Sequence, residues 1–322
     1  MNHRILSVAV IVAMGWLGAS AGATTVKLKE GATSVKVEID GKEFTTYRFL
    51  PGDDANFHRP FAYPVYAADG QAVTSDQEVT NPKEHPHHRS VWVAHGSVNG
   101  VDHWSHAKGA GIQKHIKFDK VEGDTIVEEL EWSGKTPEAP PVLKETRTLR
   151  FFALPDSTRG IDLTTELTAA NGDVTFGDTK EAGLAAVRVH PEIGNNEKGD
   201  KHRDGVLTNS VGAKGEKAIW GKPANWCDES GTINGKPYGV AIFDHPDNPR
   251  HPTTWHTREY GLHAANIFGL HDFDPKKTPK GAGDMKLAAG KSVTFKYRIL
   301  FHQGDGPSAK LDEKYKDWVA GK

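Results

Sequence analysis

The sequence predicts an all-β fold, a large antiparallel β-sandwich (supersandwich-like) with long loops and a short C-terminal helix. The 322-residue chain is rich in turn formers, with 34 glycines and 18 prolines. Short runs of alternating apolar and polar residues dominate, a pattern typical of strands that bury one face. No window keeps a helical apolar period over several turns. Stacking two sheets would bury the apolar face of each.

Turn signals such as Asp40-Gly41 and Asn234-Gly235 separate the segments that carry the strand pattern. Two pairs of long segments, 112–122 with 125–133 and 143–153 with 160–169, are expected to form antiparallel hairpins. The strands predicted in this way are 25–28, 34–39, 42–49, 112–122, 125–133, 143–153, 160–169, 183–189, 238–243 and 292–301.

One helix is predicted, at residues 308–319. Leu311, Tyr315 and Trp318 follow one another at spacings of four and three, so one helical face can pack on a sheet. The sequence shows no internal repeat and no linker between the first strand and this helix. We therefore expect a single domain over residues 24–322.

The N-terminus carries the pattern of a secretory signal peptide over residues 1–23. A short basic start at His3 and Arg4 precedes an apolar run over 5–17, and small residues end at Ala23. The run is about 13 residues long, shorter than the roughly 20 that span a bilayer. We expect cleavage after Ala23 and a periplasmic or secreted mature protein.

Charge and cysteine content exclude several classes of function. The net charge is −2 and the isoelectric point about 6.8, so nothing favours nucleic acid or an anionic membrane surface as a partner. The single cysteine, Cys227, excludes an intramolecular disulfide. No later segment is apolar enough to cross a membrane. A small-molecule or oligosaccharide ligand is the partner we expect.

The densest polar cluster begins at His85-Pro86-His87-His88-Arg89 and continues to Trp104. Histidine titrates near neutrality, so it suits proton transfer. If this segment is extended, His85, His87 and Arg89 share one side and His88 lies on the other.

The same histidines could hold a divalent metal, because neutral imidazole is a common metal ligand. His85, His87 and His88 are the candidate ligands. Their spacing is not a recognised zinc signature, since the helical two-histidine motif and cysteine ligands are absent. The sequence predicts no cofactor firmly.

A second constellation lies around His256. In a strand, His256, Arg258 and Tyr260 point to one face and the intervening residues to the other. A base, a fixed cation and a phenol on one face suit removal of a proton beside a carbonyl or carboxylate group. The same trio could instead hold a sugar without reacting with it.

Further candidates come from a polar turn and from the tryptophans. Glu181 follows the turn at 177–180 and is a candidate carboxylate partner for a histidine or a sugar hydroxyl. Flat indole faces bury the C–H surfaces of sugars. The predicted catalytic residues are His87, His256, Tyr260 and Glu181. The predicted substrate-binding residues are Arg89, His95, Trp104, Trp226, Arg258 and Asn266.

Five long segments resemble a bacterial family of exported proteins usually labelled "methane oxygenase PmoA" or a domain of unknown function. These segments are 85–104, 177–192, 224–231, 239–269 and 295–305. The resemblance covers nearly the whole mature chain and implies a fold similar to the supersandwich of aldose mutarotases and certain polysaccharide lyases. It supplies no catalytic residues. The label evokes a membrane-embedded copper enzyme, which the absence of a spanning segment does not favour.

Three functions follow as hypotheses. The first is an exported carbohydrate-active enzyme of the lyase, hydrolase or epimerase type with a cleft lined by His, Arg and Trp. The second is a non-catalytic carbohydrate-binding module. The third is a histidine-ligated metalloenzyme, the oxygenase that the family label suggests. The first requires the separate motifs to meet around one hollow.

Overall fold

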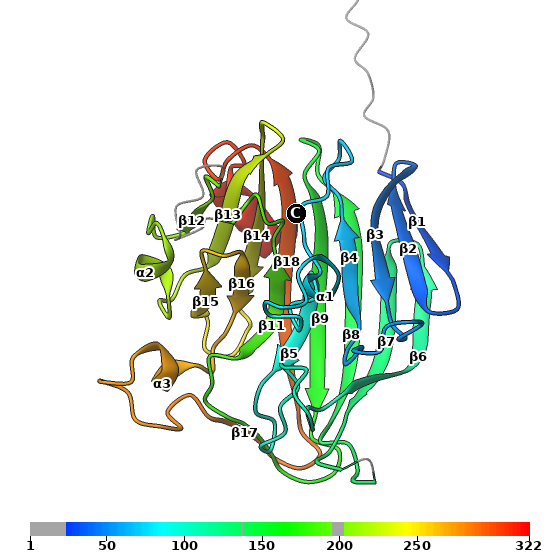
Figure 1. Cartoon of the computed structure of the whole chain (residues 1–322), viewed down its shortest axis with the longest axis vertical. Helices are drawn as coiled ribbons and strands as arrows, with labels where there is room; N and C mark the ends of the chain where they lie inside the picture. Colours follow the sequence, from blue (N-terminus) through cyan, green and yellow to red (C-terminus); the bar gives the residue numbers. More distant parts are fainter. Residues whose placement is uncertain (1–23, 137, 195–202) are drawn as a thin grey trace, which may run out of the picture.

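The computed structural model describes residues 24–136, 138–194 and 203–322, and the predicted signal peptide lies outside them. Two eight-stranded antiparallel sheets pack face to face (Figure 1), which confirms the predicted β-sandwich. In spatial order, the first sheet contains β1 (Val26–Glu30), β2 (Ser34–Ile39), β3 (Lys42–Arg48), β4 (Phe61–Val65), β5 (Val91–His95), β11 (Ala182–Arg188), β16 (Leu262–Ala265) and β15 (Trp255–Arg258).

The second sheet holds the longest strands. In spatial order it contains β12 (Val206–Asn209), β13 (Trp226–Ile233), β14 (Lys236–Asp244), β18 (Ser292–Gln303), β9 (Arg159–Thr168), β8 (Leu143–Ala153), β7 (Thr125–Trp132) and β6 (Gln113–Glu122). A small ribbon pairs β10 (Val174–Phe176) with β17 (Met285–Leu287). The short helices are α1 (Gln77–Thr80), α2 (Glu216–Ile219) and α3 (Leu270–Phe273).

The main core lies between the two sheets. In β7, burial alternates residue by residue, so Ile126, Leu130 and Trp132 face inward while their neighbours face solvent. Residues Val35 and Val37 of β2 fill the same core from the opposite sheet. This alternation is the physical reason that the pattern in the sequence predicted the strands.

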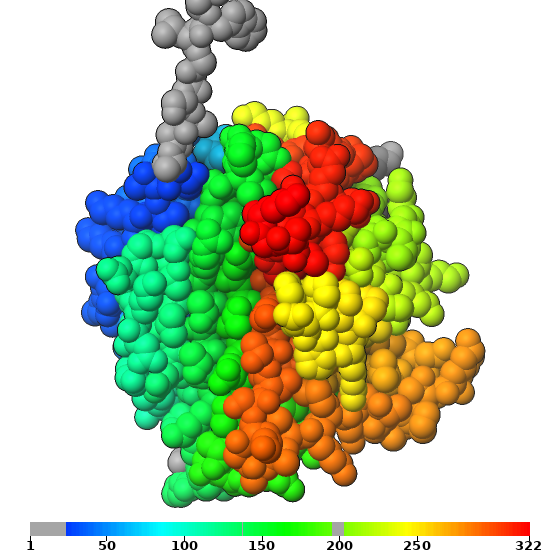
Figure 2. Space-filling view, turned by 180° about the vertical axis from the view of Figure 1, so that it is seen from behind, coloured from blue at the N-terminus to red at the C-terminus, as the bar shows by residue number. Residues whose placement is uncertain are grey.

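The C-terminal helix α4 (Leu311–Val319) covers the outer face of the second sheet. Leu311 and Tyr315 are buried in a separate apolar cluster with Phe243 and Leu300. Figure 2, which views the molecule from behind, shows this red segment on the surface beside the green strands. The predicted apolar face is confirmed, and the helix begins at Leu311 rather than at residue 308.

The outer face of the first sheet is also apolar near its middle. Trp92 of β5, Ala186 of β11, and Leu262 and Ala264 of β16 form a third buried cluster. Small alanines on the central strands leave room for side chains of the covering loops, and Trp104 from one loop packs there. Long loops and α1 therefore lie over this face (Figure 1), and they build the site described next.

Candidate functional site

A cavity of about 420 Å³ opens on the outward face of the first sheet. Its volume falls within the range of about 300–1,000 Å³ that small-molecule sites occupy. Four separate segments line it: 85–88, 102–105, 180–181 and 256–260. The lining residues are His85, His87, His88, Asp102, Trp104, Ser105, Lys180, Glu181, His256, Arg258 and Tyr260.

Strand β15 supplies one wall by simple strand alternation. His256 and Arg258 line the cavity. The side chain of Trp255 lies on the other face of the strand, between the two sheets, and is fully buried in the main core. Tyr260 lies in the tight turn to β16, where Gly261 has φ +102°, a backbone conformation that favours glycine. The predicted shared face of His256, Arg258 and Tyr260 therefore forms one wall of the cavity.

The histidine segment 85–88 is a turn, not the extended stretch considered from sequence. His85 has φ +54°, and the His88 amide donates to the His85 carbonyl at 2.9 Å. All three of His85, His87 and His88 line the cavity as a result. Their rings pack closely, with 4.9 Å between the centroids of His85 and His88 and 4.6 Å between those of His87 and His88.

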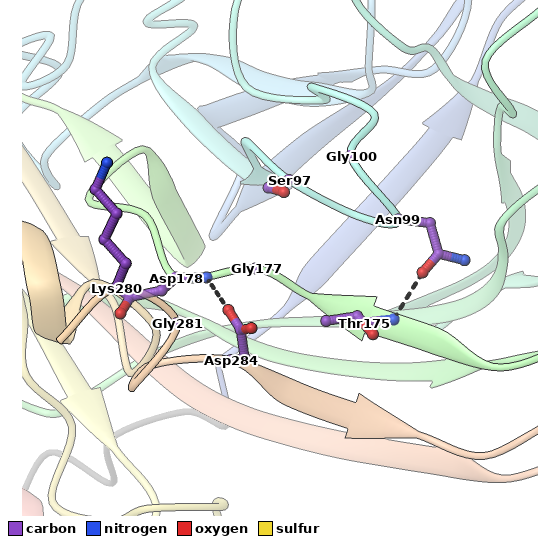
Figure 3. A pocket seen from close by; sticks show the side chains of 9 residues that line it. All are labelled: Ser97, Asn99, Gly100, Thr175, Gly177, Asp178, Lys280, Gly281 and Asp284. Atoms are coloured by element: carbon purple, nitrogen blue, oxygen red, sulfur yellow. Dashed lines mark hydrogen bonds between the residues drawn. The ribbon is translucent and has the colours of Figure 1, made fainter.

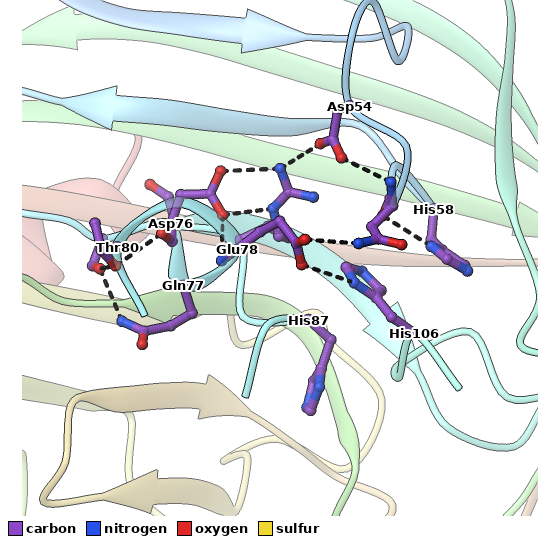
Figure 4. Close-up of polar contacts among 12 residues, drawn as sticks. Asp54, His58, Asp76, Gln77, Glu78, Thr80, His87 and His106 are labelled. Carbon is purple, nitrogen blue, oxygen red and sulfur yellow. Dashed lines mark hydrogen bonds and ion pairs between the residues drawn. The ribbon is translucent and has the colours of Figure 1, made fainter. Parts of the chain in front are cut away.

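Arg89 points away from the cavity, which corrects its predicted role in substrate binding. Its guanidinium donates to Asp76 and Asp54, each at 2.6 Å, and lies over the ring of Phe61. Figure 4 shows Asp54 and Asp76 apart from His87. A buried arginine held by two carboxylates is committed to its ion pairs. We assign Arg89 the role of anchoring the histidine turn.

Arg59 holds two cavity walls together, and sequence reasoning missed it. This buried side chain donates to the carbonyl of His87 at 3.1 Å and to that of Trp104 at 2.6 Å. The second loop is tightened further by Asp102, whose carboxylate accepts from the Trp104 amide at 2.7 Å and the Ser105 hydroxyl at 2.5 Å. No local sequence pattern distinguishes Arg59 from any other loop arginine.

Glu181 enters the site at the start of β11. Its backbone carbonyl accepts from the Gly96 amide at 2.7 Å, and a side chain at Gly96 would collide with that carbonyl. The Glu181 carboxylate pairs with Lys180. Lys180, Asp102 and Ser105 line the cavity although sequence reasoning did not select them.

Three other predicted binding residues lie outside the cavity. His95 is buried between the sheets, with its ring centroid 4.5 Å from that of Phe268. Trp226 donates to Asp312 at 2.8 Å under α4. Asn266 donates to the carbonyls of Thr179 and Lys180. These three residues therefore have structural roles instead of the predicted contact with substrate. Asn266 also supports the backbone that carries Lys180.

The imidazoles in the cavity are neutral at pH 7. Burial, reinforced by Arg59, lowers the pKa of His87 to about 4, and burial, reinforced by Arg258, lowers the pKa of His256 to about 3. The pKa of His88 lies well below its ordinary value because of burial and the neighbouring His87 and Arg188. A neutral imidazole can accept a proton.

Proton donors and cations surround these imidazoles. Burial raises the pKa of Tyr260 to about 12, so its phenol stays protonated. The Arg188 guanidinium lies 4.7 Å from the Tyr260 ring and bonds to His88 at 3.3 Å. Burial lowers the pKa of Arg59 to about 9, which still leaves it charged at pH 7. Both arginines bond to carbonyls or rings instead of carboxylates, and they lie behind a lining in which Lys180 and Arg258 balance Asp102 and Glu181.

Several polar atoms around the cavity have no partner among the residues that the structure describes. They include Nδ1 of His85, Nδ1 of His256 and Nε1 of Trp104. The Lys180 carbonyl accepts from the His256 ring, so the nitrogen that donates carries the proton and Nδ1 keeps a lone pair. Buried polar atoms are normally paired, so these atoms are exceptions among the side chains that line the cavity.

The candidate metal ligands do not form a metal centre with neighbouring donors. In the described ranges 24–136, 138–194 and 203–322, no three His, Cys, Asp or Glu side chains are arranged to hold a metal ion. His85, His87 and His88 instead pack ring against ring. None of the helices described here is both long and apolar enough to span a membrane.

A separate hollow elsewhere on the molecule, of about 660 Å³, is of a different kind (Figure 3). Ser97, Asn99, Asp178, Lys280 and Asp284 are among its lining residues, and none of the lining side chains is aromatic. Its polar groups mostly serve the backbone, as when the Asp178 amide donates to Asp284 at 2.7 Å. The cavity of about 420 Å³, which histidine, tryptophan and tyrosine side chains line, is therefore the candidate functional site, and we call it the aromatic cavity.

The fold and the cavity define a β-sandwich protein with a loop-walled cavity on one sheet face. The chain belongs to a family of unknown function (DUF6807), whose model matches residues 34–316. This agrees with the uncharacterised family that the sequence resembles, and the description names no activity, so the oxygenase label stays a prediction. No curated protein matches the chain.

Among solved structures, similar chains include "Polysaccharide Lyase BACCELL_00875", at 10% identity and a TM-score of 0.33, covering 89% of this chain and 33% of that one. A "putative kojibiose phosphorylase from human microbiome" has 8% identity and a TM-score of 0.32, and the match covers 61% of this chain and 21% of that one. A GalM/aldose epimerase homologue from C. elegans has 8% identity and a TM-score of 0.36, and the match covers 88% of this chain and 100% of that one. This chain spans about a third of the first of these structures and a fifth of the second.

Proposed function

We propose that this protein is a carbohydrate-active enzyme that removes a proton from a sugar bound in the aromatic cavity. The observation that supports this most strongly is the meeting of four segments around one hollow, with neutral imidazoles beside a protonated phenol and fixed cations. The flat faces of Trp104 and the histidine rings suit sugar C–H surfaces, and the polar groups suit hydroxyls.

His256 is the proposed base and Tyr260 the proposed acid. His256 keeps a free lone pair on Nδ1, and Tyr260 keeps its proton at neutral pH. The proton would leave a carbon beside a carbonyl or carboxylate group, where the electron pair is delocalised into an enolate. Arg258 and the field of Arg188 would stabilise that negative charge. His87 and Glu181 are the further candidates for proton transfer from the opposite walls.

The pairing of the carboxyl groups favours elimination or epimerisation over glycoside hydrolysis. Hydrolysis passes through a transition state with positive charge on the sugar and uses two free carboxyl groups. Here Asp102 is committed to Ser105 and to its own loop, and Glu181 is paired with Lys180. Within the proposal, the electron pair left on carbon either expels the substituent on the adjacent carbon or is reprotonated on the other ring face.

The test is incubation in D₂O with methyl glycosides of glucuronic acid, galacturonic acid and ketosugars, followed by mass spectrometry and NMR. Deuterium at a sugar carbon or an unsaturated product supports the proposal. Binding without either product favours the non-catalytic sugar-binding module. Hydrolysis without exchange of a carbon-bound hydrogen also overturns the proton-abstraction mechanism.

The proposal includes export to the periplasm or the medium. The basic start, the apolar run and the small residues before Thr24 support it. Mass spectrometry of the mature protein from a periplasmic fraction should give Thr24 as the first residue. An intact N-terminus in the cytoplasm would contradict this part.

A further inference from the structure

A second cavity adjoins the first and shares a wall with it. It has a volume of about 370 Å³ and is lined by Glu216, Lys217, Trp220, Arg258 and Glu259. Arg258 lines both cavities, so they lie on its two sides. None of the other lining residues was selected from the sequence as a site residue.

The shared wall is a well-defined arrangement of three side chains. The guanidinium of Arg258 lies 3.8 Å from the centre of the Trp220 ring and donates to Glu216 at 2.6 Å. The rings of Trp220 and His256 also pack at 87° to one another, with centroids 5.1 Å apart. The proposed base in the first cavity is therefore in contact with the indole of the second.

Backbone contacts hold the second cavity in place. The Glu216 amide donates to the Glu259 carboxylate at 3.2 Å, and the Glu259 amide donates to the Glu216 carboxylate at 3.0 Å. These reciprocal bonds join the segment around α2 to the turn after β15. The amide of Gly221 donates to the carbonyl of Trp255 at 2.9 Å, which fixes the chain directly after Trp220. The relative position of the two cavities is thus set by the fold.

We propose that the two cavities are adjoining subsites for consecutive units of one substrate, which is then an oligosaccharide or a glycoside rather than a free monosaccharide. This inference rests on the proposed function. The second cavity has two carboxylates, two cations and one half-buried indole, so its charges balance. Such a lining fits a neutral sugar unit, whose hydroxyls bond to the charged groups and whose apolar face meets the aromatic ring.

The test compares methyl galacturonide and methyl glucuronide with disaccharides that join the same acid to a neutral hexose. Calorimetric titration of the wild-type protein should show at least about tenfold tighter binding of one disaccharide than of its methyl glycoside. Trp220→Ala should remove most of that advantage, measured as the ratio of the two affinities, because Trp220 also packs on Arg258 and His256 of the first cavity. Lys217→Ala, at an exposed position, should reduce the advantage without risk to the fold.

Three outcomes separate the two proposals. Equal affinity for every disaccharide and its methyl glycoside overturns the second subsite and leaves the proposed function standing. An advantage that survives both Trp220→Ala and Lys217→Ala also overturns it, because the second unit then binds elsewhere. Absence of binding by all of these compounds contradicts the proposed function itself and removes the basis of the subsite. Thermal unfolding of each variant confirms that it is folded.

Discussion

The imidazole of His256 lies against the indole of Trp104, with 6.0 Å between their ring centroids and 28° between their planes. His256 comes from an edge strand of the first sheet, and Trp104 from a loop far away in sequence that Arg59 and Asp102 hold in place. The sheet and its covering loop thus bring together a proton acceptor and an apolar ring face, the two features that the proposed reaction on a sugar uses.

Replacing the proposed base should abolish turnover. His256→Gln keeps a polar side chain of similar size but cannot accept the proton. We expect kcat/KM to fall by about 10²–10⁴, with the midpoint of urea unfolding nearly unchanged. His245→Gln is the matched control, because His245 contacts Trp318 outside the cavity. Full activity in His256→Gln would remove this residue from the mechanism.

The pH profile of the reaction should be flat around neutrality. His256 and His87, with pKa values of about 3 and 4, are already deprotonated at pH 6, and Tyr260, with a pKa of about 12, stays protonated. We expect constant kcat/KM between about pH 6 and pH 8, below the pKa of about 9 of Arg59. A bell-shaped profile with an inflection near the ordinary pKa of histidine would contradict the proposed protonation states.

The free energy of unfolding should fall as the pH drops below the ordinary pKa of histidine, about 6.5. His263 and His103 are buried, and burial lowers the pKa of each to about 4, whereas in the unfolded chain each titrates near 6.5. Between these values the unfolded state binds more protons, so lowering the pH favours unfolding. Each such histidine should cost about 1.4 kcal/mol per pH unit. Urea unfolding at pH 7 and pH 5 measures this, and equal midpoints would contradict it.

His95 offers a specific test of that effect. Both of its ring nitrogens are buried without partners among the described residues, and the ring stacks on Phe176 and Phe268. His95→Phe should therefore raise the free energy of unfolding by about 1–2 kcal/mol and weaken its dependence on pH below 6. Activity should not change, since His95 does not line the cavity. A loss of binding or turnover would return His95 to the functional site.

Arg59 should act by positioning the two loops. Arg59→Lys retains the positive charge but cannot reach the carbonyls of both His87 and Trp104 in the same way. We expect roughly tenfold lower kcat/KM and a loss of about 2–3 kcal/mol in the free energy of unfolding. Wild-type kinetics in Arg59→Lys would show that the charge alone matters.

The long strands could be predicted because each buries one face only. In β7 the inward residues alternate with partly exposed ones, and the sequence pattern follows this alternation except at Val127 and the buried Glu128. In β5 and β16 every residue is buried, because loops cover the outer face of the sheet, so no alternation marks them. These short strands escaped prediction, although Trp104 of the cavity wall packs on their outer face.

Site residues could be predicted where strand alternation sets the direction of their side chains. They could not be predicted where contacts between distant segments set it. His256 and Arg258 share a face because they lie two apart in β15. Arg89 was misassigned because its partners, Asp54 and Asp76, come from other segments and only the folded chain brings them to it. The turn at His85 replaces the extended conformation considered from the sequence, and it brings His85, His87 and His88 to one cavity.

The central claim, that four segments form one ligand site, is tested most directly by calorimetric titration of the best ligand from the D₂O panel. One variant probes each segment: His87→Gln, Trp104→Phe, Glu181→Gln and Arg258→Lys. We expect each to weaken binding at least about fivefold, while Trp226→Phe, a tryptophan outside the cavity, leaves the affinity unchanged. Wild-type affinity in all four variants would contradict the claim.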